Sequence, residues 1–223
     1  MASQLRQTYT AELDQLRLQV EVMAVRVDEN LERMREVLRT GDERLAALGV
    51  NADDDIDAMN VSLTERCYDI LRRESPVAAD LRVVVSVVRM LTELERVGDL
   101  ALRVMKLAPD HGLLVGHEPI ADILAVMADQ AIDSYRLALR AWSTEDLAIA
   151  TQLAAGGNSM GLYRERLTAE LLRLTAPDAV AIALVATTAA QAFDRIADHA
   201  SIMGARLRYL ITGDPDHLAA EVR

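Results

Sequence analysis

A seven-residue pattern occurs twice in this chain, once in each half. The segment from Glu95 to Ala101 and the segment from Asp194 to Ala200 both read acid, Arg, β-branched apolar, small residue, Asp, any residue, Ala. Both lie within helical patterns, so each places two carboxylates at i and i+4, one above the other on a helix face. Such stacked like charges repel unless a positive group lies between them. The repeat therefore predicts a duplicated helical architecture with a cation or a basic partner at each half.

The spacing of apolar residues predicts an all-α protein made of two tandem three-helix bundles related by internal duplication. We expect the first bundle over residues 1–110 and the second over 118–223, with a linker at about 109–118 that contains Pro109 and Gly112. The expected helices of the first bundle cover about 5–40, the segment from Asp42 to about 74, and a segment that Ser75-Pro76 opens as N-cap and first helical residue. Those of the second cover about 118–142, a segment that starts at Thr144, and a segment from Pro177 to about 212.

The amino-acid composition is typical of packed helices, and the net charge counts against some classes of binding partner. Hydrophobic residues make up 51% of the 223 residues, but aromatic residues only 3%. A formal net charge of −11 counts against nucleic acid or an anionic membrane surface as a direct ligand. The apolar uncharged run from Ala179 to Phe193 is shorter than the roughly 20 residues that span a bilayer, which predicts no membrane insertion. With no signal peptide and a single cysteine, Cys67, we expect a soluble cytoplasmic protein.

A second pair of acids with the same spacing precedes the first motif. Asp53 and Asp57 lie at the edge of an apolar stripe on the second helix, and continuing the apolar stripe of the third helix leads to Glu95. Together with Asp99, two helices can supply four carboxylates to one cluster, and oxygen ligands suit hard divalent or ferric ions. The alternative is a structural network in which Arg96 and Arg195 neutralise the acids.

These residues resemble the PhoU family of cytoplasmic regulators of bacterial phosphate uptake. The resemblance rests on Asp53 to Asp57, on Ser75-Pro-Val-Ala-Ala-Asp-Leu-Arg82, on Glu93 to Asp99 and on Asp194 to Asp198, and it covers essentially the whole chain in the expected order. It implies two three-helix bundles, no enzymatic activity, and metal ions (iron, zinc, manganese or magnesium) held by paired motifs of adjacent helices.

The resemblance also implies a negative regulator that links the ATPase of a phosphate ABC transporter to a sensor histidine kinase. The metal ligands it assigns are Asp53, Asp57, Glu95, Asp99, Asp194 and Asp198. A ferritin-like metalloenzyme is disfavoured, because no Glu-x-x-His spacing occurs. The competing hypothesis is a metal-free helical adaptor whose acids form only ion pairs. The native metal, direct phosphate binding, the particular kinase and transporter, and the oligomeric state stay open, with a homodimer among the candidates.

The second half departs from the family pattern. When Ile56 is aligned with Met160, the positions that match Asp53 and Asp57 are Gly157 and Gly161, and no acid occurs between Asp146 and Glu165. We therefore expect one strong metal site in the first half and a doubtful one in the second. His199 occupies the variable position of its motif, and we expect it at the surface rather than among the ligands.

Overall fold

The computed structural model describes residues 2–156, 160–175 and 177–222, and every regular element in these ranges is a helix. The first half contains α1 (Ala2–Thr40), α2 (Glu43–Glu74) and α3 (Ala78–Met105). A short η1 (Ala108–Asp110) and α4 (His111–Val115) follow. The second half contains α5 (Glu118–Thr144), α6 (Leu147–Ala154), α7 (Met160–Leu171) and α8 (Ala179–Thr212), and η2 (Pro215–Val222) ends it. The predicted all-α class is confirmed.

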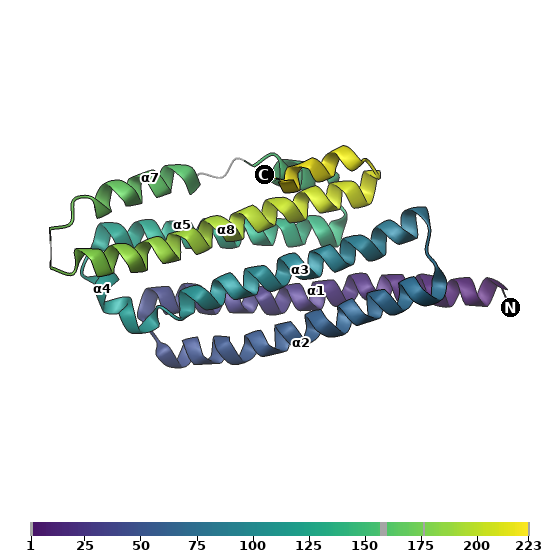
Figure 1. The fold of residues 1–223 in the computed structure, drawn as a ribbon, viewed down its shortest axis with the longest axis horizontal. Helices are drawn as coiled ribbons and strands as arrows, with labels where there is room; N and C mark the ends of the chain where they lie inside the picture. Colours follow the sequence, from purple (N-terminus) through teal and green to yellow (C-terminus); the bar gives the residue numbers. More distant parts are fainter. Residues whose placement is uncertain (1, 157–159, 176, 223) are drawn as a thin grey trace.

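The helices form two three-layered bundles that lie against each other (Figure 1). In the first, α1, α2 and α3 all pack on one another. In the second, α5 packs on α8, and α6 and α7 together take the place that α2 has in the first. The tandem-bundle architecture is therefore confirmed. The division into domains at 1–110 and 118–223 stays a prediction, because α3 and α8 also pack closely across the two halves.

Two helix ends in the first half test the expected capping residues. Gly41 ends α1 with φ of 69°, and the Asp42 side chain accepts hydrogen bonds from the backbone N–H groups of Arg44 and Leu45, as predicted. The prediction for Ser75-Pro76 was wrong. Ser75 is the left-handed C-cap of α2, and α3 begins only at Ala78, after Val77 as N-cap.

The middle segment of the second half is broken where one continuous helix was expected. Its start is not Thr144: Glu145 caps the end of α5 in a left-handed conformation, and the Asp146 side chain then caps α6. The helix ends again before Gly156, whose φ is 60°, and α7 begins at Met160. The low helix propensity of the glycines explains this break. Gly157 lies outside the described residues.

The helix α3 lies at the centre of the molecule, in contact with α1, α2 and α8. It buries a broad face, as expected for the most buried helix of the first half. However, the stripe that led to Glu95 lies at the edge of this buried face: Val84 and Leu91 are buried, but Leu81 is 41% exposed and Glu95 is only half-buried. The acid that occupies a core position of α3 is Glu93, which is 7% exposed.

Within the described residues, α8 is long and apolar enough to cross a membrane by length and composition alone. The apolar stretch continues past Phe193, where the sequence prediction had ended it, because the charges that follow are few. In the structure α8 packs on α3, α5 and α6, and a central helix of a bundle meets the same criterion.

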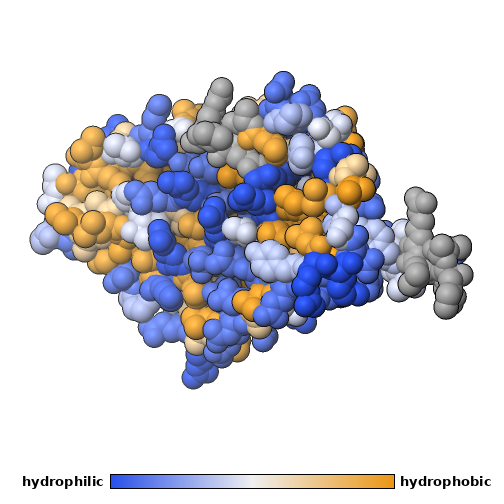
Figure 2. Space-filling view, turned by 45° about the vertical axis from the view of Figure 1, so that its right-hand side comes forward, coloured by the Kyte–Doolittle hydropathy of each residue, from blue (hydrophilic) through white to orange (hydrophobic). Residues whose placement is uncertain are grey.

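The surface drawn in Figure 2 has no uniform character. Hydrophilic side chains cover its middle, whereas hydrophobic side chains gather at the left-hand end and in smaller patches. Single exposed apolar residues are ordinary for a folded chain and do not by themselves mark a binding site. Charged side chains are therefore the first candidates for a functional site.

Candidate functional site

The first predicted acid, Asp53, is held where α2 crosses α3. It is 7% exposed, and a Cβ placed on Gly98 of α3 would lie 3.1 Å from Asp53 Oδ1. A side chain at position 98 would therefore crowd the carboxylate. The glycine of the repeated motif has a packing reason, because it lets the buried carboxylate lie directly against the backbone of the neighbouring helix.

The raised pKa of Asp53 shows that the four predicted acids of the first half interact electrostatically. Burial raises the pKa of Asp53 to about 6 from 3.8, and the charges of Asp57, Asp99, Asp54 and Glu95 add to the shift. Burial disfavours the charged carboxylate, and neighbouring like charges disfavour it further. Asp53, Asp57, Glu95 and Asp99 are thus electrostatically coupled, and we call them the first-half acid cluster.

The other members of this cluster reach toward solvent. Asp57 and Asp99 are exposed and Glu95 is half-buried. Burial, followed by the charge of Asp99, raises the pKa of both Asp57 and Glu95. For Glu95 the opposing charges of Arg96 and His199 reduce the shift without reversing it. The first-half acid cluster thus has one buried and three more accessible carboxylates.

No protein cation neutralises the first-half acid cluster within the described part of the chain. None of its four carboxylates has an Arg, Lys or His nitrogen within ion-pair distance, and Arg96 makes no such contact. Nor do any three His, Cys, Asp or Glu side chains in those ranges already stand in a ligand arrangement. The donor chemistry fits a hard metal ion, which would draw the carboxylates together and remove the repulsion behind the raised pKa values.

The acids of the second half lie in a different environment. Arg164 of α7 forms an ion pair with Asp194 of α8 at 2.9 Å. Burial and the charge of Asp194 raise the pKa of Asp198, whereas Arg195, His199 and Arg164 oppose the shift. The helix that faces this motif contributes a cation where α2 contributes acids, and Gly161 of α7 has no carboxylate to offer. The structure thus brings Asp194 and Asp198 together without a second acid pair.

Sequence reasoning missed the buried polar contact that joins the two halves. Nδ1 of His199 lies 2.6 Å from Oε2 of Glu93, and the two side chains are 13% and 9% exposed. His199 had been expected at the surface, and this was wrong, because its side of α8 faces α3. The signal was present in the sequence: Glu93 follows Met90 by three residues and precedes Val97 by four, on a buried stripe.

Comparison with known proteins agrees with this arrangement. The family model of the PhoU domain matches residues 20–108, which hold about half of α1 and all of α2 and α3. A relative from Serratia marcescens, the phosphate-specific transport system accessory protein PhoU, is 25% identical over 216 residues, covering 96% of this chain and 88% of its own. A solved PhoU structure from Pseudomonas aeruginosa has a TM-score of 0.75 at 26% identity, and covers 92% of this chain and all of its own. The chain thus contains a PhoU domain in its first half and resembles PhoU proteins along nearly its full length.

Other PhoU proteins match along nearly the full chain as well. Phosphate-specific transport system accessory protein PhoU homolog 2 of Mycobacterium tuberculosis is 27% identical, and the match covers 94% of this chain and 99% of that protein. The regulatory protein PhoU of the phosphate transport system of Streptococcus pneumoniae has a TM-score of 0.81 at 22% identity, a likeness of fold alone. The likeness thus includes the second half, although the family model matches the first half only.

Proposed function

We propose that this protein is an accessory regulator of phosphate uptake that binds a metal ion at the first-half acid cluster. The observation that carries the proposal is the electrostatic coupling of four carboxylates from α2 and α3, none of which has an ion-pair partner among the described residues. The relatives that match nearly the full chain are accessory proteins of the phosphate-specific transport system, which supports the transport role.

In this proposal Asp53, Asp57, Glu95 and Asp99 hold the ion through their oxygen atoms. Iron, manganese, magnesium and zinc are the candidates, and oxygen ligands favour the harder ions among them. The ion would stabilise the folded chain by mass action and fix α2 against α3. Asp194 and Asp198 would form at most a weaker second site, since Arg164 already neutralises part of their charge.

The proposed partners are the ATPase subunit of a phosphate ABC transporter and a sensor histidine kinase, with negative regulation as the outcome. A chain with a net charge of −11 would associate with basic cytoplasmic surfaces of such proteins, more weakly as salt rises. We place the protein in the cytoplasm, without enzymatic activity of its own, and with a homodimer as one assembly to test.

The alternative is a metal-free helical adaptor whose acids form structural ion pairs. The Arg164–Asp194 pair favours it for the second half. The first-half acid cluster does not, because its carboxylates lack such partners among the described residues. Metal analysis of the purified protein separates the two hypotheses.

Deletion of the gene in a strain with a phosphate-starvation reporter tests the regulatory role. We expect constitutive reporter expression at high phosphate, restored to repression by the unmodified gene. A variant with Asp53→Asn and Glu95→Gln should fail to restore repression. A control with Asp55→Asn and Glu65→Gln removes two exposed acids of the same helix and should restore it. An unchanged reporter in the deletion strain would contradict the proposed function, and full repression by both variants would contradict the metal's part in it.

A further inference from the structure

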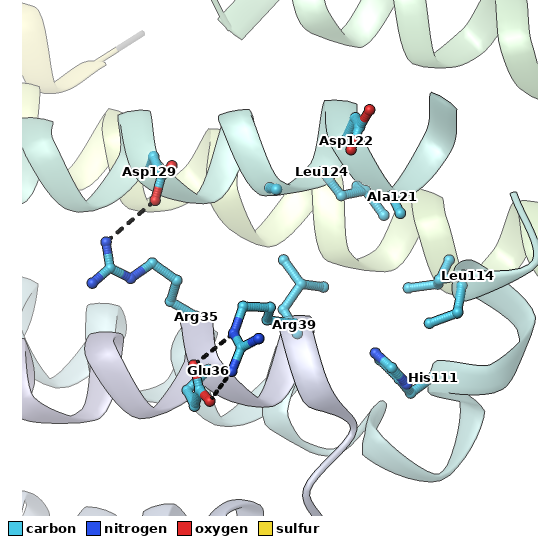
Figure 3. Close-up of a pocket in the computed structure, with 12 residues that line it drawn as sticks. Arg35, Glu36, Arg39, His111, Leu114, Ala121, Asp122, Leu124 and Asp129 are labelled. Carbon is cyan, nitrogen blue, oxygen red and sulfur yellow. Dashed lines mark hydrogen bonds and ion pairs between the residues drawn. The ribbon is translucent and has the colours of Figure 1, made fainter. Parts of the chain in front are cut away.

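A pocket of about 480 Å³ lies at the junction of the two halves, and no member of the first-half acid cluster lines it (Figure 3). It is bounded by the last turns of α1, by α4 and by the first turns of α5. Its size falls within the range of small-molecule sites, which often lie between domains. Leu114 and Leu124, which are 4% and 0% exposed, supply an apolar wall.

Three nitrogen-bearing side chains from two helices line this pocket. Arg35 and Arg39 extend from α1, one turn apart, and His111 extends from α4 toward the same space (Figure 3). The imidazole of His111 is fixed by the end of α1: a Cβ on Gly41, whose φ is 69°, would lie 2.6 Å from His111 Cγ. The close packing of this ring on the backbone means that the site is partly preorganised.

Both arginines form ion pairs with carboxylates that a ligand oxyanion can replace. Arg39 donates two hydrogen bonds to Glu36, of 3.0 and 2.6 Å, and its side chain is 71% exposed. Arg35 pairs with Glu32 on its own helix and, at 3.4 Å, with Asp129 across the pocket. Exposed ion pairs of this kind contribute little to stability, so an incoming oxyanion can replace their carboxylates.

We propose that this pocket binds a small phosphate monoester. The phosphate oxygens would accept hydrogen bonds from Arg35, Arg39 and His111, since two guanidinium groups and an imidazole offer more donors than the two oxygens of a carboxylate can use. The organic part would lie against Leu114 and Leu124, in space that inorganic phosphate leaves unfilled.

The opposite wall limits the charge that a ligand can carry. Asp122 and Asp129 of α5 line this wall, and Glu36 lies on the α1 side beside Arg39. These carboxylates would repel a second phosphate group, which selects a monoester over a polyphosphate, and Asp122 can accept a hydrogen bond from a ligand hydroxyl. Binding at this pocket requires neither a metal ion nor a transporter, so it goes beyond the proposed function and can fail independently of it.

Calorimetric titration of the full chain with phenyl phosphate, in the presence of EDTA, tests the proposal. We expect phenyl phosphate to bind more tightly than inorganic phosphate by at least about tenfold, from burial of the ring against the leucines. Arg39→Gln should weaken phenyl phosphate binding by at least about tenfold, as loss of a charge-assisted hydrogen bond does. Arg26→Gln is the matched control, because Arg26 also pairs with a glutamate three residues away on the exposed face of α1.

The titrations distinguish a specific phosphate monoester site from unspecific attraction to arginines and from no binding. Binding of phenyl phosphate that Arg39→Gln weakens and Arg26→Gln leaves unchanged supports the site. No binding at millimolar phenyl phosphate would overturn the proposal, and so would equal losses from the two variants, which would mean unspecific attraction to arginines. Equal affinity for inorganic and phenyl phosphate would overturn the monoester assignment. Circular dichroism of both variants verifies that each is folded.

Discussion

The buried carboxylate of Asp53 should make the metal-free protein less stable than it would be without that charge. The pKa of Asp53 is raised from 3.8 to about 6 in the folded state. At about 1.4 kcal/mol per unit, this shift corresponds to a cost of at most about 3 kcal/mol. Because the folded state binds the proton more tightly, the cost is fully present above pH 6 and disappears as pH falls toward 4.

Asp53→Asn removes that charge while keeping the shape of the side chain. In EDTA at pH 7.5, we expect the variant to exceed the unmodified protein in free energy of unfolding by about 1–3 kcal/mol, a range that allows for hydration of the site and for an imperfectly paired amide. At pH 4.5 the difference should fall to about a third of its value at pH 7.5. With Mn²⁺ the order should reverse, because only the unmodified protein gains stability from the ion.

Urea unfolding followed by circular dichroism at both pH values measures these differences. Asp55→Asn is the control, since Asp55 is exposed and does not contribute to the shift of Asp53. The reasoning would be refuted if Asp53→Asn destabilised the metal-free protein at pH 7.5, or if its effect were the same at pH 4.5.

Three further predictions concern the packing of the halves. His199→Ala leaves the buried Glu93 without its partner and should lower the free energy of unfolding by about 2–4 kcal/mol in urea titration, whereas Glu93→Gln with His199→Gln, which keeps a neutral pair, should recover part of the loss. Gly204→Ala should lower the free energy of unfolding by about 1–2 kcal/mol, because the new Cβ would lie 2.7 Å from Leu153 Cβ and the cost of overpacking exceeds the gain in helix propensity. The control Gly161→Ala, whose Cβ would have no atom within 4 Å, should be neutral or slightly stabilising. Fragments 1–112 and 114–223 should each be mostly helical by circular dichroism, and two random-coil fragments would show that the halves share one core.

Periodicity was enough to predict the architecture, because long helices with apolar residues three and four apart have few ways to bury them. Asp42 also marked the start of α2 correctly, and Gly41 and Gly213 end α1 and α8 with positive φ, since a positive φ or a side-chain cap is a local property. Ser75-Pro76 misled because the same residues suit either side of a helix boundary. The chain used Ser75 to end α2 rather than to begin α3.

The candidate site was predicted in part for a similar reason. Spacing along one helix places Asp53 with Asp57 and Glu95 with Asp99, and the contact between α2 and α3 that joins the pairs follows from the bundle. The Glu93–His199 contact depends on the packing of α3 against α8, which periodicity within one helix does not specify. The Arg164–Asp194 ion pair likewise could not be predicted, because it depends on where α7 lies. The glycines before α7 indicate a break in the helix but not its length.

The asymmetry between the halves is the most direct test of the account. Calorimetric titration with Mn²⁺, Fe²⁺, Zn²⁺ and Mg²⁺ should give one strong site for at least one of these ions. Glu95→Gln with Asp99→Asn should abolish most of that binding, and Asp194→Asn with Asp198→Asn should change it much less. Equal losses from the two double variants, or no binding of any of the four ions to the unmodified protein, would contradict a metal site at the first-half acid cluster.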